Sequence, residues 1–225
     1  MKNIIGILNK CMLFKNVHEE EIEKIIRKIN YKIGEYAKDS VVAFEEDDCS
    51  LLGIIIDGTI EIRKIYSSGK NVTLTQLKKS HIFGEAIMFS NFNQYPATVI
   101  SVARSKIIFI PKEEIVKICS QNEIILKNFM NLLSNKILML NKKVKELSLD
   151  TLREKICFYL FEEHKKQKSL KIKLSMSREG LAKYMGVQRP SLSREMIKLR
   201  DEGIIDFDRS TVTIKDIRNI EDILI

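Results

Sequence analysis

The 225-residue sequence predicts an α+β protein with a β-rich first part, a helical middle and a C-terminal helix-turn-helix. Three observations predict that order. Short segments rich in β-branched residues, separated by turn residues, occupy residues 1–111. A helical region at 112–148 carries an apolar heptad repeat from Leu126 to Leu147, and two short helical segments separated by a glycine follow within residues 149–225. These three ranges are the expected domains.

After a helix expected at 18–29, the first part has the pattern of β-strands separated by turns. The strands are expected at 41–44, 51–56, 59–66, 72–77, 97–102 and 106–110. The pair Asp57-Gly58 predicts a two-residue hairpin between two of these strands, and residues 67–70 predict a second turn. Strands spaced this regularly predict an antiparallel sandwich or barrel.

The helical part carries an unbroken apolar seam whose spacings alternate between four and three over three heptads, the a/d pattern of paired helices. The seam consists of Leu126, Met130, Leu133, Ile137, Leu140, Val144 and Leu147. A second apolar stripe lies on an adjacent face and consists of Ile125, Phe129, Leu132 and Met139. Two stripes predict two partners, the β-rich part and a second copy of the chain. A helix packed only within its own chain is the alternative.

The third part begins with a helix expected at about 151–164 and continues into a helix-turn-helix. Ser177 is a candidate N-cap, Gly186 ends the first short helix, and Pro190 lies in the first turn of the second helix, where a missing N–H is tolerated. The buried face of this second helix is expected to consist of Leu192, Met196 and Leu199. Two β-rich segments that follow it predict a hairpin wing.

The excess positive charge of the chain is concentrated in this third part. The chain has 38 basic and 30 acidic residues, and residues 164–200 alone carry 11 basic residues against two acids. The rest is close to neutral, with 27 basic and 28 acidic residues. Charge gathered on one segment favours a polyanionic partner, and nucleic acid is favoured over a membrane. A solvated surface without a partner is the alternative.

The cysteines and histidines exclude several kinds of metal site. The four cysteines, at 11, 49, 119 and 157, are never closer than 38 positions. That spacing excludes CxxC zinc sites, an iron–sulfur motif and a disulfide framework. The three histidines are scattered, and His81 is interpreted as structural rather than as a haem ligand. No metal or cofactor is expected.

Signals for secretion, membrane insertion and catalysis are not found in the sequence. Asn9 and Lys10 interrupt the N-terminal apolar stretch, and the longest apolar run, 51–56, is far too short to span a bilayer. No nucleophile–base pair, clustered carboxylates or phosphate-binding loop is found. We therefore expect a soluble cytoplasmic protein that is not an enzyme.

Two motifs flank the heptad helix. FGE at 83–85 is followed by YPA at 95–97, and LAKYMGVQRPSLSR occupies 181–194. With both motifs in this order, the whole chain resembles the Crp/Fnr family of bacterial transcription regulators. The resemblance implies a β-roll with the jelly-roll fold of cyclic-nucleotide-binding domains, a long dimerisation helix and a winged helix-turn-helix.

The resemblance places an effector site at the first motif. In the family's cyclic-nucleotide binders, a Gly-Glu pair is followed by an Arg-Ser pair that holds the cyclic phosphate. Gly84 and Glu85 match the first pair, but Tyr95 and Pro96 stand in place of the second. A guanidinium and a hydroxyl are thereby lost, so the expected effector is not cyclic AMP. A turn in which the Glu85 carboxylate is solvated or caps the backbone is the alternative.

The resemblance also places DNA contacts along the second motif. Arg189 and Arg194 fall where the family's arginines contact base edges, most naturally O6 and N7 of guanine. Pro190 replaces a frequent glutamate, so the base preference of other members does not transfer. The alternative for Arg194 is a surface salt bridge with Glu195 or Glu202. The other expected contacts, to phosphates or flanking bases, are Arg178, Gln188, Ser191 and Lys198.

These features predict a homodimeric transcription regulator that binds double-stranded DNA at an inverted repeat. An unidentified small effector in the β-roll would change the population of the DNA-competent state. RNA polymerase stays open as a further partner. Two alternatives remain: a regulatory subunit that acts on a protein partner, and a redox-responsive regulator that uses its cysteines.

Overall fold

The computed structural model describes residues 2–224. Contacts divide the chain into two compact units, and the division falls between Ile137 and Leu138, inside the long helix α4 (Glu123–Leu147). The three-part division expected at 111 and 148 stays a prediction. None of the described helices is both long enough and apolar enough to cross a membrane.

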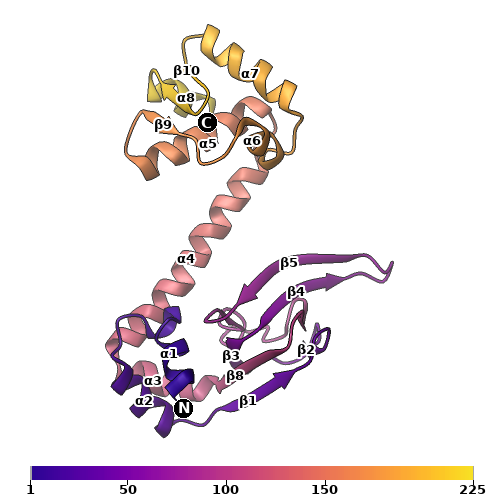
Figure 1. The fold of residues 1–225 in the computed structure, drawn as a ribbon, viewed down its shortest axis with the longest axis vertical. Coiled ribbons are helices and arrows are strands. Elements are labelled where there is room, and N and C mark those ends of the chain that lie inside the picture. The colour runs from indigo at the N-terminus through magenta and orange to yellow at the C-terminus, as the bar shows by residue number, and fades with distance from the viewer. Residues whose placement is uncertain (1, 225) are drawn as a thin grey trace. The chain divides into compact units, whose positions relative to one another are not determined.

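The first unit is built on two four-stranded antiparallel sheets, as the sequence predicts (Figure 1). One sheet has the order β1-β8-β3-β6 and the other the order β2-β7-β4-β5. The strands are β1 (Lys32–Tyr36), β2 (Val41–Ala43), β3 (Leu51–Asp57), β4 (Thr59–Ile65), β5 (Asn71–Lys78), β6 (Ile82–Phe83), β7 (Thr98–Ser101) and β8 (Ser105–Pro111). Strands β4 and β5 extend beyond the rest of the sandwich as a long hairpin (Figure 1).

The hairpin predicted at Asp57-Gly58 is wrong. Strands β3 and β4 flank this pair but belong to different sheets, so the turn carries the chain from one sheet to the other. Gly58 has φ +85°, and a Cβ there would lie 2.3 Å from Ser105 Oγ and 2.4 Å from the Arg104 carbonyl oxygen. The glycine is required by that close approach. The second predicted turn, at 67–70, is confirmed, since β4 and β5 pair on either side of it.

Helices cover one end of the sandwich and close its core. They are α1 (Lys2–Leu8), the 3-10 turn η1 (Met12–Phe14), α2 (Glu19–Lys28) and α3 (Lys112–Gln121). Helix α2 confirms the helix predicted at 18–29, with three glutamates in its first turn and basic residues in its last, which suits the helix dipole. Leu13, Phe14 and Ile22 are fully buried and pack in one core with Leu52, Ile54 and Ile108 of the sheets.

The helical region predicted at 112–148 consists of two helices, because Asn122 interrupts it between α3 and α4. Its backbone is extended, its side-chain Oδ1 accepts from the Ile125 amide at 3.0 Å, and its Nδ2 donates to Glu21 at 2.7 Å. This amide caps the start of α4. Ile125, Phe129 and Leu132 then bury the first half of the helix against the first unit, as predicted for the second stripe.

The second unit is a three-stranded sheet of order β10-β11-β9 packed with four helices. Its elements are α5 (Leu152–Gln167), β9 (Lys171–Lys173), α6 (Arg178–Tyr184), α7 (Arg189–Asp201), β10 (Ile205–Phe207), β11 (Thr211–Ile214) and α8 (Ile217–Ile223). Helix α5 starts with a reciprocal capping box between Thr151 and Glu154. The helix-turn-helix and hairpin wing are confirmed, whereas β9 and α8 were not predicted.

Candidate nucleic-acid interface

Local signals set the geometry of the α6–turn–α7 segment. Ser177 Oγ accepts from the Gly180 amide at 3.1 Å and caps α6. Gly186 has φ +70°, which ends the helix and turns the chain. Pro190 is the second residue of α7, where no intrahelical N–H is needed. The two helices therefore begin and end where the sequence predicts.

Helix α7 is anchored by one face. Leu192, Met196 and Leu199 are at most 2% exposed, and they pack with residues of α5, α6 and the three-stranded sheet. The opposite face carries the residues expected to read DNA. Those that are exposed there are Gln188, Arg189, Ser191, Arg194 and Lys198. A rigid helix thus presents a polar and basic face to solvent.

Glu195 of α7 and Glu202, which follows the helix, are both neutralised by Arg153. Arg153 on α5 donates from Nε to Glu195 at 3.0 Å and from Nη1 to Glu202 at 2.7 Å, with a second bond from Nη2 to Glu202. Lys198 lies a further 3.6 Å from Glu195. The salt bridge considered for Arg194 is therefore absent, and within residues 2–224 no ion pair is recorded for it.

Arg178 differs from the other expected DNA contacts because its guanidinium is already engaged. The side chain is half-buried and donates to the backbone carbonyl of Asp208 at 3.1 Å. Its guanidinium carbon lies 4.9 Å from the centre of the Phe207 ring. Desolvation lowers the pKa of Arg178 below the usual arginine value. Arg178, the first residue of α6, therefore packs its side chain against the wing.

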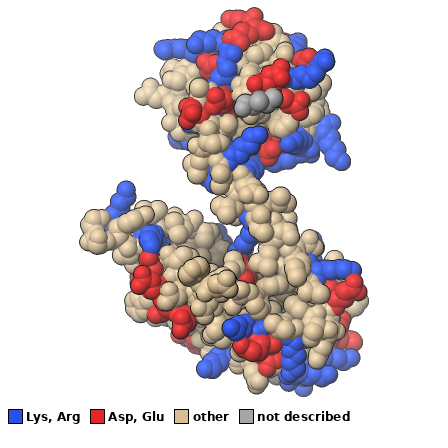
Figure 2. All heavy atoms as spheres, turned by 180° about the vertical axis from the view of Figure 1, so that it is seen from behind, with Lys and Arg blue, Asp and Glu red and all other residues tan. Residues whose placement is uncertain are grey.

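Figure 2 shows basic side chains along the rim of the second unit, with acidic side chains among them. Part of this charge comes from β9, where Lys171 and Lys173 flank the buried Ile172 and point to the exposed face of the sheet. Lys165 and Lys166, at the end of α5, are partly neutralised because they form ion pairs with Glu162 and Glu163. The positive excess seen in the sequence is thus spread over several surfaces of this unit.

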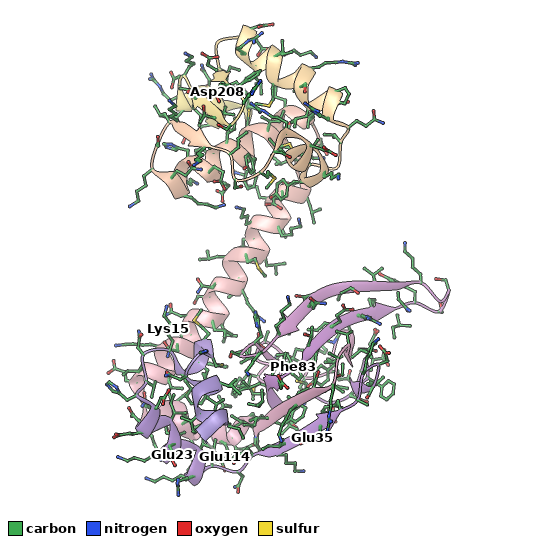
Figure 3. All side chains as sticks on the ribbon, in the orientation of Figure 1. Lys15, Glu23, Glu35, Phe83, Glu114 and Asp208 are labelled. Carbon is green, nitrogen blue, oxygen red and sulfur yellow. The ribbon has the colours of Figure 1, made fainter. Side chains whose placement is uncertain are left out.

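The predicted effector residues lie in the first unit, after β6. Phe83, labelled in Figure 3, covers Gly53, where a Cβ would lie 2.3 Å from its ring. Gly84 has φ +86°, and a Cβ there would lie 2.8 Å from the Leu51 carbonyl oxygen and 3.1 Å from Cys49 Sγ. Only glycine fits this approach without strain.

Tyr95 is 7% exposed and its hydroxyl lies beside the Cys49 thiol. Burial, together with that thiol, raises the pKa of Tyr95 above the usual tyrosine value. Pro96 is exposed, so the four expected effector residues do not share one surface. Cys49, which joins Gly84 to Tyr95, was not among the expected residues.

Glu85 is neither solvated nor a backbone cap, so that alternative is wrong. Its carboxylate is 1% exposed, and Oε1 forms an ion pair with the ammonium group of Lys136 on α4. The second oxygen, Oε2, is buried without a recorded partner among the described residues. Lys136 lies 51 positions away in the sequence, and no local pattern indicates the pair.

The four cysteine thiols are partly or fully buried in this fold. No disulfide links the four cysteines, all of which lie in the described part of the chain. Burial raises the pKa of Cys11 to about 11 and that of Cys157 to about 12, and it raises the pKa of Cys49 and Cys119 as well. Thiolate is the reactive form, so a raised pKa lowers the fraction of each thiol that can react at neutral pH. Residues 2–224 hold no cluster of three or more His, Cys, Asp or Glu suited to a metal.

The heptad seam on α4 is exposed along most of its length. Exposure rises from 37% at Leu126 to 76% at Leu147, while Leu133 is partly buried. From the second stripe, Met139 is also 66% exposed. Helix α4 thus carries an exposed row of apolar side chains at coiled-coil spacing.

Comparisons with known proteins match both units. The family model of the cyclic nucleotide-binding domain matches residues 33–122, and that of the Crp-like helix-turn-helix domain matches residues 154–223. The chain is 26% identical over 168 residues to the Anaerobic regulatory protein of Bacillus subtilis (strain 168), covering 72% of this chain and 71% of that protein.

Two further comparisons cover nearly the whole chain. The Cyclic AMP receptor protein of Thermus thermophilus is 18% identical over 211 residues, covering 94% of this chain and 95% of that protein. The crystal structure of Thermus thermophilus catabolite activator protein has the same fold, with a TM-score of 0.56 at 18% identity over 95% of this chain and 98% of that one. With both domains matched in this order, the chain belongs to the Crp/Fnr family of DNA-binding transcription regulators, which are not enzymes.

Proposed function

We propose that this regulator acts in the cytoplasm as a homodimer that binds an inverted-repeat operator in double-stranded DNA. The exposed outer face of α7 carries this proposal, because Arg189 and Arg194 extend from a firmly packed helix without competing ion pairs among residues 2–224. A recognition helix with these properties suits the major groove, where arginine reads O6 and N7 of guanine.

The remaining exposed residues of α7 suit contacts to phosphates and flanking bases rather than base reading. Gln188 and Ser191 lie near its leading end, where they would contact phosphates or flanking bases. Lys198 keeps 67% of its side chain exposed and is a point charge suited to a phosphate. Pro190 offers no acceptor side chain, so the cytosine contact that a glutamate makes is lost here.

The seam on α4 supports the dimer. Its exposed members repeat at the spacing of a two-helix coiled coil, and pairing with the same seam of a second copy would bury them. Two copies bring two recognition helices, which predicts half-sites about 34–36 Å apart. This arrangement requires an operator with twofold symmetry.

An effector in the β-roll would control the dimer by changing the population of its DNA-competent state. Cyclic AMP is a poor candidate, although the Thermus relative is named for it. Tyr95 and Pro96 replace the phosphate clamp, and Lys136 already neutralises the Glu85 carboxylate. RNA polymerase is a further partner that a regulator of this kind can use.

The salt dependence of binding to a non-specific DNA duplex tests this function. The wild-type protein should bind at low salt, and log K should fall linearly with log salt concentration. Lys198→Ala, which removes a proposed phosphate contact, should weaken this binding, whereas Lys24→Ala, which removes an exposed charge from α2 in the first unit, should not. No retention on duplex DNA at low salt would contradict the proposal and would favour a regulatory subunit that acts on a protein partner.

A further inference from the structure

The wing of the second unit is fastened to the helix-turn-helix by Arg178, the first residue of α6. Its Nη2 donates to the Asp208 carbonyl at the end of β10, at 3.1 Å, and its Nη1 contacts the sulfur of Met196 on α7. Its guanidinium carbon lies over the Phe207 ring of β10 at 4.9 Å from the ring centre. One side chain therefore joins α6, α7 and the wing.

These contacts leave Arg178 poorly suited to a DNA phosphate. Guanidinium donors are fixed in one plane, so a phosphate would have to displace the carbonyl or move the group from the ring. Arg200 lies over the same ring at 5.4 Å, which secures Phe207 from a second residue of the helical layer. We call the contacts of Arg178 with Met196, Phe207 and Asp208 the clasp, because they join the wing to the helices within one chain.

The clasped segment is a rigid turn. The Asp208 carboxylate, labelled in Figure 3, accepts from the Ser210 amide at 2.9 Å, the Thr211 amide at 2.8 Å and the Thr211 hydroxyl at 2.7 Å. Arg209 lies within this turn and is exposed, and the structure records no ion pair for it between residues 2 and 224. The hydrogen-bonded turn thus exposes the guanidinium N–H donors of Arg209 to solvent.

Arg209 faces the same groove as the recognition helix. A hollow of about 510 Å³ lies between α6, α7 and the wing, and its lining includes Arg178, Arg189, Arg209, Ser177 and Ser193. Arg189 is the proposed base reader at the start of α7. A DNA backbone beside the bases that Arg189 reads would pass this groove, where three arginines outnumber the carboxylates of Glu179 and Asp208 and so favour phosphate.

We propose that Arg178 is a positioning residue that holds the wing against α7, so that Arg209 contacts a DNA phosphate beside the bases read by the recognition helix. The proposal rests on the proposed DNA-binding function. It moves the phosphate contact from Arg178, where the family resemblance placed it, to the wing. Arg209 would supply affinity and register, whereas sequence reading stays with α7.

Hydrogen exchange of the free protein tests the clasp without DNA. Arg178→Lys keeps the charge but loses the planar donors and the ring contact. It should speed exchange at the Ser210 and Thr211 amides and leave α5 protected, whereas Arg218→Ala on α8 should change neither. Unchanged protection of the two wing amides in Arg178→Lys would overturn the clasp, whatever the protein does with DNA.

The salt slope of DNA binding tests the connection to Arg209. Arg209→Ala should reduce the slope by about one, the value for one lost phosphate contact. Arg178→Lys should reduce it equally, and the double variant should lose no more than either single variant. The proposal fails if Arg178→Lys keeps the wild-type salt slope while the slope reductions of Arg178→Ala and Arg209→Ala add in the double variant. That result would mean that Arg178 itself contacts phosphate. Wild-type protein that binds no duplex would contradict the DNA-binding function, and the exchange result would still decide the clasp.

Discussion

The turn after β6 and the recognition helix α7 both carry charged residues at the family's binding positions, but they use them in opposite ways. Glu85, in the turn, is 1% exposed and paired with Lys136 of the same chain. Arg189 and Arg194, on α7, are exposed, with no recorded ion pair among residues 2–224. A side chain already neutralised within the fold has little left for a ligand, whereas an exposed guanidinium keeps its donors.

The position of the counter-charge explains this difference. In the second unit, Arg153 pairs with Glu195 and Glu202, so these two carboxylates form no ion pair with Arg189 or Arg194. In the first unit, Lys136 pairs with the motif glutamate itself. The two regions therefore differ in how far their charged motif residues are neutralised, and in both the deciding partner lies outside the motif.

The largest expected effect breaks the proposed dimer, which would bring two α7 helices to one operator. Ile137→Glu places a carboxylate at the centre of the seam, and burying it without a partner should cost on the order of 3–5 kcal/mol. Sedimentation should then show monomers and specific DNA binding should be lost. Asn135→Glu, exposed and off the seam, is the matched control and should stay dimeric. An unchanged dimer in Ile137→Glu would mean that the seam packs elsewhere.

The next effect tests the exposed arginines of α7 directly. Arg194→Ala should weaken binding to the cognate site by roughly 1–3 kcal/mol and reduce discrimination at one base pair. Lys198→Ala should instead weaken all sequences alike and lower the salt slope by about one. Competition titrations with single-base variants of the site measure both. Unaltered base preference in Arg194→Ala would make Arg194 a phosphate anchor.

The third prediction concerns the buried motif, where the expected effect is close to none. Cyclic AMP should show no binding with a Kd below about 100 µM in calorimetry, because Tyr95 and Pro96 replace the Arg-Ser pair that would hold its phosphate. The Thermus thermophilus Cyclic AMP receptor protein serves as the positive control. Low-micromolar binding to this chain would show that the Glu85–Lys136 pair opens for a ligand, and the contrast between the two motifs would fail.

The smallest effect is expected at the cysteines. With pKa values of about 11 and 12, Cys11 and Cys157 should be protonated thiols at pH 8, and alkylation of the folded protein should leave both unmodified. Mass spectrometry after iodoacetamide treatment, with and without denaturant, measures this. Rapid labelling of the native protein at either residue would revive the redox-responsive alternative.

Local chemistry is what the sequence predicts well in this protein. The Ser177 cap, the Gly186 turn and Pro190 near the start of α7 act over a few residues, so the helix-turn-helix follows from the order of the residues alone. The apolar seam is likewise readable, because its spacing is set by the helix period. The exposed face of α7 follows directly from its buried face.

Pairings between distant residues could not be predicted. Asp57-Gly58 has the composition of a hairpin turn, yet the strands on either side join different sheets, a choice made by tertiary packing. Lys136 reaches Glu85 across 51 positions, and Arg178 reaches Asp208 across 30. No periodicity marks such contacts, so Glu85, predicted to bind an effector, and Arg178, predicted to contact DNA, both have partners inside the chain that the sequence did not indicate.

A binding selection over randomised duplexes tests the central claim most directly, namely that a dimer reads DNA through the outer face of α7. The wild-type protein should enrich an inverted repeat with half-site centres about 34–36 Å apart and guanines opposite Arg189 and Arg194. Pro190→Glu should change the preferred base at one step and keep the spacing. No enrichment, a lone half-site, or the same preferences in Arg194→Ala would contradict the account.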